Sequence, residues 1–278
     1  MDILTVIQRV KAYCNGKDID DTTSRDQILY GNPHQPCTGI VTTCWASVEV
    51  IRKAHAQGAN LIICHEALFW NHGDHTEWLE ENKNQTFLKK RQLLEDTGIV
   101  VWRCHDYIHA GIPINGQYTD GIFYGFAKQL GWESYIIQDL HQPLFYDIPK
   151  SDVKTIAKQM LNCFHLDGMR ILGDINAEIE HVFICAHVMG RGDNELITRV
   201  DHEGIDLLIT LELIDYTASE YIRDSSMLGA GKAILSMGHF NAEEPGMEYM
   251  AAYLPEAIQD HVPCSYIQSG DMYHYITK

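Results

Sequence analysis

The segment Gly238-His239-Phe240-Asn241-Ala242-Glu243 places an imidazole and a carboxylate four residues apart, directly after an apolar run. If a helix begins here, His239 lies at its start and Glu243 lies one turn further on, pointing the same way. Such a pair can bind one metal ion. Two earlier segments, Cys64-His65-Glu66 and Cys104-His105-Asp106-Tyr107-Ile108-His109, also offer nitrogen and oxygen donors after an apolar run. We therefore expect three remote segments to meet around a metal site.

Three expected β-strands position these segments. They cover residues 60–64 (NLIIC), 99–103 (IVVWR) and 232–237 (KAILSM), and each is a short apolar run. In parallel α/β sheets, reactive groups collect beyond the carboxyl ends of the strands, because loops and helix N-termini converge there. The three histidine segments stand at that position.

The rest of the chain alternates between helical and strand patterns, which predicts an α/β protein with a mixed or largely parallel sheet flanked by helices. Expected helices cover residues 3–14, 47–57, 77–97, 120–130, 151–163, 194–202, 214–223 and about 241–253. Further expected strands cover residues 39–44, 169–172, 181–188, 206–210 and 265–268, with a hairpin formed by 135–140 and 144–149.

Composition and charge exclude several classes of protein. The 278 residues carry 21 Lys plus Arg against 38 Asp plus Glu, a formal charge of −17, which argues against nucleic acid as a partner. No apolar run approaches the roughly 20 residues that span a bilayer, and the first residues lack the charged and apolar regions of a signal peptide. We expect a cytoplasmic protein that does not associate with a membrane.

The histidines and cysteines indicate which metals suit the chain. Fifteen histidines favour metal or acid–base chemistry, whereas the eight cysteines are scattered without a Cys-x-x-Cys pair. Imidazole and carboxylate donors suit zinc, iron, cobalt or manganese. Cys64 and Cys104 precede their histidines, and we expect both to be buried core thiols rather than nucleophiles.

Three further residues are candidates for the lining of a pocket. Glu212 and Asp215 follow the expected strand at 206–210 and stand at another strand end. Arg191, in the turn Gly190-Arg191-Gly192-Asp193, is a candidate for contact with a substrate, although this turn lacks the Lys-Ser/Thr of a phosphate-binding loop.

The chain resembles a known family over most of its length. The run from Val41 to Trp70, with Gly58-Ala59-Asn60-Leu61-Ile62-Ile63-Cys64-His65-Glu66 at its centre, resembles the NIF-three-like family of dinuclear-metal proteins. Some members of that family are described as GTP cyclohydrolase I type 2. In the family, the motifs His-His-Pro, His-x-x-x-Asp and Gly-His-x-x-x-Glu supply five ligands to two metal ions, and the last motif is intact here as Gly238-His239 to Glu243.

The other two motifs depart from the family pattern. His65-Glu66-Ala67 stands for His-His-Pro, and the segment from His105 to His109 stands for His-x-x-x-Asp. One ligand changes from His to Glu and another from Asp to His, so three imidazoles and two carboxylates are still present. This exchange favours a retained dinuclear site, with Asp106 as an alternative to His109.

The resemblance implies a site and a chemistry. By residue-wise carry-over, the metal ligands are His65, Glu66, His109, His239 and Glu243, with His105 as a catalytic acid–base or supporting residue. Two divalent ions would lower the pKa of a shared water and polarise a substrate oxygen, which is hydrolase chemistry.

The same resemblance organises the chain into two lobes with the metal site between them. Residues 1–130 plus 232–278 form the expected first lobe and residues 131–231 the second, and the family implies a homohexamer. We expect a dinuclear-metal-dependent hydrolase of an unidentified small-molecule substrate, with nucleotide or cyclohydrolase activity as possibilities. The alternative is a metal-binding assembly or regulatory protein without turnover.

Overall fold

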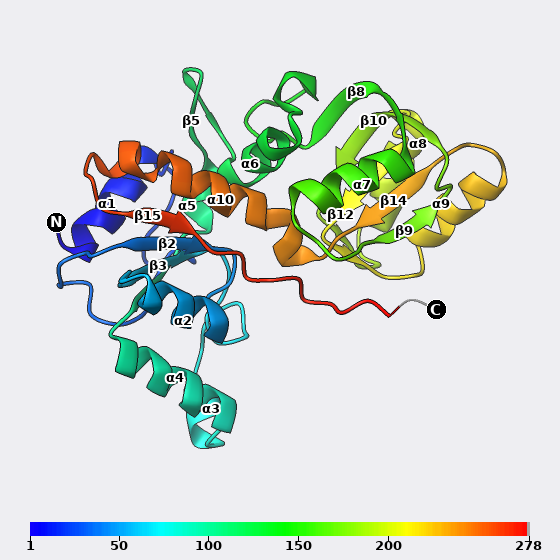
Figure 1. Ribbon diagram of the computed structural model, residues 1–278. Coiled ribbons are helices and arrows are strands. Elements are labelled where there is room, and N and C mark those ends of the chain that lie inside the picture. Colours follow the sequence, from blue (N-terminus) through cyan, green and yellow to red (C-terminus); the bar gives the residue numbers. More distant parts are fainter. Residues whose placement is uncertain (277–278) are drawn as a thin grey trace. The chain divides into compact units, whose positions relative to one another are not determined.

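The computed structural model describes residues 1–276, which form two compact units (Figure 1). The first unit comprises Met1–Gly125 and Gly246–Ser269, and the second comprises Phe126–Pro245 and the described residues from Gly270 on. The expected α/β fold with two lobes is therefore present. Residues 126–130, 232–245 and 270–276, which the sequence placed with the first lobe, group here with the second. Within that unit, strand β14 (Ala233–Ser236) lies between two other strands of the sheet.

A five-stranded sheet forms the centre of the first unit. Its order is β1 (Ile28–Tyr30), β4 (Val100–Arg103), β3 (Leu61–Cys64), β2 (Ile40–Thr43) and β15 (Cys264–Tyr266). β4, β3, β2 and β15 run parallel to one another, and β1 is antiparallel to β4. The strands β2, β3 and β4 are buried on both faces, which explains why they read as continuous apolar runs in the sequence.

Helices cover both faces of this sheet. Val41, Ile62 and Val101 lie in register and pack against α2 (Val48–Ala56) and α4 (Gln85–Thr97). Across the sheet lie α1 (Ile3–Tyr13) and the C-terminal part of α10 (His239–Ile258), whose Met247 carbonyl accepts a hydrogen bond from Thr42 (Figure 1). The remaining elements of this part of the chain are α3 (Glu77–Glu81), α5 (Asp106–Ala110), the hairpin of β5 (Ile112–Ile114) and β6 (Gln117–Thr119), and α6 (Gly121–Leu130).

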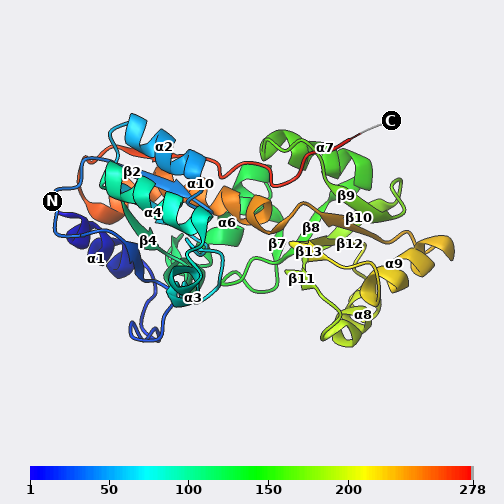
Figure 2. The ribbon, with the colours of Figure 1, turned by 90° about the horizontal axis from the view of Figure 1, so that it is seen from below.

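A six-stranded mixed sheet forms the second unit. Its order is β7 (Ile136–Ile137), β8 (Phe145–Asp152), β10 (Glu178–Ile184), β12 (Leu207–Thr210), β14 and β9 (Arg170–Gly173). Of these strands, β10, β12 and β14 are mutually parallel. Beside this sheet, β11 (His187–Val188) and β13 (Glu212–Leu213) form a separate parallel pair (Figure 2). The helical elements are η1 (Glu133–Tyr135), α7 (Val153–Cys163), α8 (Asp193–His202) and α9 (Ala218–Met227).

Local backbone features explain where the expected elements differ from the observed ones. The expected helix at 77–97 is two helices, because the chain turns at Lys83 (φ 50°) and Asn84 then caps α4 by accepting from the Phe87 amide. The expected strand at 181–188 is divided into β10 and β11 at Ala186 (φ 53°). Helix α9 begins at Ala218 rather than at 214, after Thr217 donates its amide to Glu220.

Several short elements were not anticipated from the sequence, namely strand β1, helix α5, the β5–β6 hairpin, the 3₁₀ helix η1 and strand β13. Helix α10 also begins at His239 and extends to Ile258, beyond the expected 241–253. Within residues 1–276, no helix combines the length and the apolar character that crossing a membrane requires.

Candidate metal centre

Three imidazoles gather in the first unit, at the carboxyl end of its parallel sheet. His65 follows β3 and is fully buried, His105 immediately precedes α5, and His109 lies in α5. Each of the three residues offers a ligand atom, and these atoms lie within 4.8 Å of one another. The rings of His65 and His105 are stacked with centroids 4.5 Å apart, and the ring of His109 is 4.9 Å from both.

Helix α5 brings His105 and His109 together. In an extended strand, residues 105 and 109 would lie too far apart to share an ion. One helical turn instead brings them close together on the same side. Asp26, from the loop before β1, holds the start of this turn, because its buried carboxylate accepts from the amides of His105, Asp106 and Tyr107 at 2.6–2.8 Å. Burial raises the pKa of Asp26, and these three hydrogen bonds oppose that shift.

The Nδ1 atom of each imidazole faces an oxygen. His65 Nδ1 lies 3.1 Å from the Cys104 carbonyl, His105 Nδ1 lies 2.9 Å from Asp106 and His109 Nδ1 lies 2.8 Å from Asp120. Because carbonyl and carboxylate oxygens accept hydrogen bonds, Nδ1 is the donor in each pair, and in the neutral ring the ligating lone pair is then on Nε2. Metal-binding histidines are commonly oriented in this way. The donor set therefore fits a divalent ion.

His105 is neutral at neutral pH. Burial, together with the neighbouring His65 and His109, lowers its pKa to about 3, despite the hydrogen bond to Asp106. Asp106 itself is held by the loop before β1, because its carboxylate accepts from the Arg25 amide at 2.8 Å and from the Ser24 hydroxyl at 3.0 Å. Asp106 thus links the imidazole of His105 to this loop and fixes the orientation of the ring.

Glu66 is buried beside His65. The amides of His65 and Glu66 donate to the Cys44 carbonyl at 3.0 and 2.8 Å, which fixes the turn that carries both residues to the end of β2.

The cysteines next to the histidines belong to the core, as the sequence indicated. Burial raises the pKa of Cys64 to about 12 and that of Cys104 well above the usual range, so neither is a thiolate.

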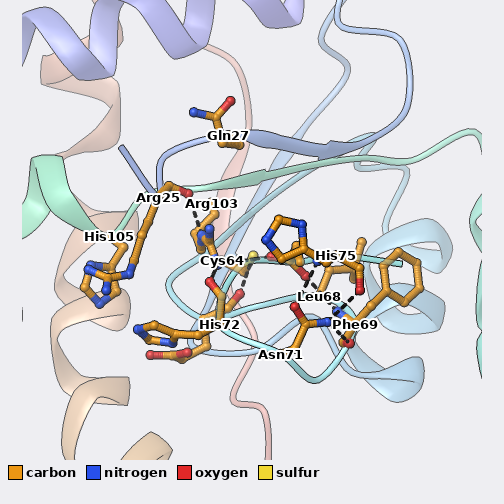
Figure 3. Close-up of polar contacts among 12 residues, drawn as sticks. Arg25, Gln27, Cys64, Leu68, Phe69, Asn71, His72, His75, Arg103 and His105 are labelled. Atoms are coloured by element: carbon orange, nitrogen blue, oxygen red, sulfur yellow. Dashed lines mark hydrogen bonds and ion pairs between the residues drawn. The ribbon is translucent and has the colours of Figure 1, made fainter. Parts of the chain in front are cut away.

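A buried arginine connects the loops around the histidines (Figure 3). Arg103, the last residue of β4, donates to the carbonyls of Arg25 and His72 and forms an ion pair with Asp74 at 3.0 Å. The side chains of Arg103 and Asp74 are 4% and 9% exposed. This pair holds the loop at 72–74, whose His72 ring lies 6.1 Å from the ring of His105, so His72 borders the cluster.

The second unit carries its own donors. His239 begins α10, its Nε2 lies 3.3 Å from the Glu243 carboxylate, and its Nδ1 contacts the carboxylate of Glu212. The other Glu212 oxygen contacts His187 of β11, and hydrogen bonds from both imidazoles lower the pKa of Glu212 against the effect of burial. His187, Glu212 and His239 form a second group whose ligand atoms lie within 4.8 Å.

A pocket of about 480 Å³ adjoins this second group. Glu212, His239, Arg170 and Tyr273 line it together with apolar side chains. Glu212 was expected to line a pocket, whereas Asp215 and Arg191 border two other hollows. Sequence reasoning did not single out Asp26, Asp120 or His187. Of these three, Asp120 carried a local signal, that of a helix cap directly before a helical pattern.

Comparisons with known proteins agree with this fold. The model of the family described as Duf34/NIF3 (NGG1p interacting factor 3) matches residues 1–271. Among solved structures, the Staphylococcus aureus hypothetical protein SA1388 is similar with a TM-score of 0.70 at 15% identity, over 99% of both chains. A Bacillus cereus protein related to NIF3 has a TM-score of 0.67 at 12% identity over 99% of both chains, and TTHA1606 from Thermus thermophilus has 0.61 at 18% over 99% of both. No curated protein matched the chain.

Proposed function

Since this chain belongs to the Duf34/NIF3 family, we propose that it is a metal-dependent hydrolase with a dinuclear centre. The proposed ligands are His65, Glu66 and His109 of the first unit with His239 and Glu243 of the second. The observation that carries the proposal is the imidazole cluster of the first unit, in which an oxygen fixes each Nδ1. Purely structural histidines do not require three such arrangements within one cluster.

One helix, α10, carries two of the proposed ligands and continues into the first unit. Helix α10 is continuous from His239 to Ile258, and the unit boundary falls between Pro245 and Gly246, only three residues after Glu243. In the first unit, Gly246 lies so close to α6 that a Cβ atom there would be 2.4 Å from the Cα of Ile122. The helix that carries His239 and Glu243 therefore also contains the first residues of the chain's return to the first unit.

The residues of the cluster have separate roles in the proposed reaction. Bound divalent ions would supply Lewis acidity toward a carbonyl or phosphoryl oxygen of the substrate. Asp120 and the Cys104 carbonyl orient His109 and His65, and Asp106 orients His105. With its Nδ1 held by Asp106, His105 would use Nε2 for any proton transfer in the reaction. The spacing of the rings also suits His105 as an additional imidazole ligand.

The first experiment combines metal analysis with a search for turnover. The purified protein is stripped with a chelator, reloaded separately with zinc, iron, manganese and cobalt, and assayed against panels of phosphoesters, nucleotides and cyclic amides. Metal-dependent hydrolysis that is lost in His109→Ala supports the proposal. Stoichiometric metal without turnover on any panel favours the alternative, a metal-binding assembly or regulatory protein. Mass measurement of the same samples in solution tests the proposed homohexamer.

A further inference from the structure

Three elements of the second unit bring together His187, Glu212 and His239. Strands β11 and β13 pair in parallel with His187 directly opposite Glu212, and α10 contributes His239. One ligand atom from each residue lies within 4.8 Å of the other two. Neither His187 nor Glu212 belongs to the five ligands proposed above, so this group shares only His239 with the proposed dinuclear centre.

The backbone holds this arrangement in place. The Thr210 hydroxyl contacts the carbonyls of both Ala186 and Glu212, at 2.8 and 2.6 Å, and the Leu211 amide donates to Ala186 at 2.7 Å. The two short strands are thereby fixed to each other beside the main sheet. Such preorganisation reduces the conformational entropy that three side chains lose when they bind one ion.

The donor set and its exposure suit a metal ion. Glu212 directs one carboxylate oxygen to His187 and the other to His239, so two nitrogens and a carboxylate converge. The side chains of His187, Glu212 and His239 are 52%, 34% and 29% exposed, and Glu212 and His239 line the 480 Å³ pocket. Three protein ligands with a fourth position open to a pocket are typical of exchangeable or catalytic zinc sites.

We propose that His187, Glu212 and His239 form an additional binding site for a borderline divalent cation such as Zn²⁺. The ion would take Nδ1 of each imidazole and an oxygen of Glu212, and the Nδ1 proton of each neutral ring would move through solvent to Nε2 of the same ring. His239 Nε2, which lies 3.3 Å from Glu243, points away from this site. When the proposed dinuclear centre is also filled, His239 bridges the two centres as an imidazolate and releases its last ring proton to solvent. The additional site does not require the dinuclear centre.

The test counts ions per chain. The full-length protein is stripped with a chelator, reloaded with excess Zn²⁺ and desalted, and zinc and protein are then quantified. His187→Ala is expected to retain one ion fewer per chain than the wild type. Without metal, the two proteins should have the same thermal stability because His187 is exposed.

The matched control is His181→Ala. His181 Nδ1 also pairs with a carboxylate, that of Asp147 at 2.7 Å, and both side chains are half-exposed. Within residues 1–276, however, this pair belongs to no group of three potential ligands. The control should therefore retain the wild-type count.

Two outcomes overturn the proposal. Equal zinc content in the wild type and in His187→Ala would mean that the three residues form hydrogen bonds only and bind no ion. An equal loss of zinc in His181→Ala would show that the effect is not specific to the site. Cobalt loading gives a second readout, since the visible absorption of the additional Co²⁺ should disappear in His187→Ala. His65→Ala separates the two centres, because it should remove ions from the dinuclear centre while the ion that depends on His187 remains.

Discussion

The Nδ1 atom of His109 and the carboxylate of Asp120 lie 2.8 Å apart, and the same carboxylate caps the N-terminus of helix α6. Asp120 Oδ1 accepts from the amides of Ile122 and Phe123 at 2.9 and 3.2 Å, while Oδ2 accepts from His109. One buried side chain therefore both caps α6 and fixes the ring of a proposed ligand. Its two functions can be separated by mutation.

Asp120→Asn should preserve stability and weaken metal binding. The amide oxygen of Asn can still cap α6, whereas the charge that orients His109 is lost, so metal affinity should fall roughly 10- to 100-fold. Asp120→Ala removes both functions and should also lower the free energy of unfolding by about 1–2 kcal/mol. Zinc titration and urea denaturation of both variants measure the two effects. Unchanged metal affinity in Asp120→Asn would remove His109 from the ligand set.

Arg103→Met should destabilise the first unit strongly. It leaves the Asp74 carboxylate buried without its cation and removes the donor to the Arg25 and His72 carbonyls, which predicts a loss of at least about 3 kcal/mol in the free energy of unfolding. The control is Arg91→Ala, because the Arg91–Glu80 pair has the same 3.0 Å separation but is exposed. The control should change stability by less than about 1 kcal/mol. Similar losses in the two variants would contradict a role for burial.

The main strands and helices could be predicted because their signals are local. The runs LIIC and VVWR are buried on both faces, so hydrophobicity alone identified β3 and β4 and placed His65 and His105 at their ends. The β5–β6 hairpin was missed although it has a local signal, since Asn115 and Gly116 both adopt positive φ at its turn.

The supporting residues of the site could not be predicted from the sequence. Asp26 stabilises α5 from about 80 residues away, and nothing in its neighbours indicates that partner. His187 lies inside an expected strand. The positive φ at Ala186, which divides that strand and precedes the pairing of His187 with Glu212, is not indicated by the residue type. The segment from His105 to His109 was recognised as important, but its helical conformation depends on these tertiary hydrogen bonds.

The exchange of ligand types between Glu66 and His109 can be tested as a double-mutant cycle. Glu66→His alone changes the ligand set to four imidazoles and one carboxylate and should weaken metal binding. The double variant Glu66→His with His109→Asp restores three imidazoles and two carboxylates, so it should recover much of the lost affinity. Calorimetric titration with zinc measures the four affinities. Additive losses in the double variant would indicate that the two positions do not serve one centre.

Lys90 gives a prediction for the pH dependence of stability. Its amine is buried, donates to the Leu68 carbonyl at 2.7 Å and faces the rings of Trp45, Phe69 and Trp70 at 5.2–5.7 Å. Burial lowers the pKa of Lys90 from 10.5 to about 8. Between these two values the unfolded chain keeps its proton and the folded chain has lost it, so the contribution of Lys90 to stability rises with pH across this window.

The comparison with Lys90→Met isolates this effect from other groups that titrate at alkaline pH. Below pH 8 the difference in the free energy of unfolding between wild type and variant should be constant. From pH 8 toward 10.5 the difference should move in favour of the wild type by about 3 kcal/mol, since one pKa unit corresponds to about 1.4 kcal/mol. Urea denaturation of both proteins between pH 7 and pH 10 measures the trend. A difference that stays flat over this range would mean that the folded protein holds the Lys90 proton as firmly as the unfolded chain does.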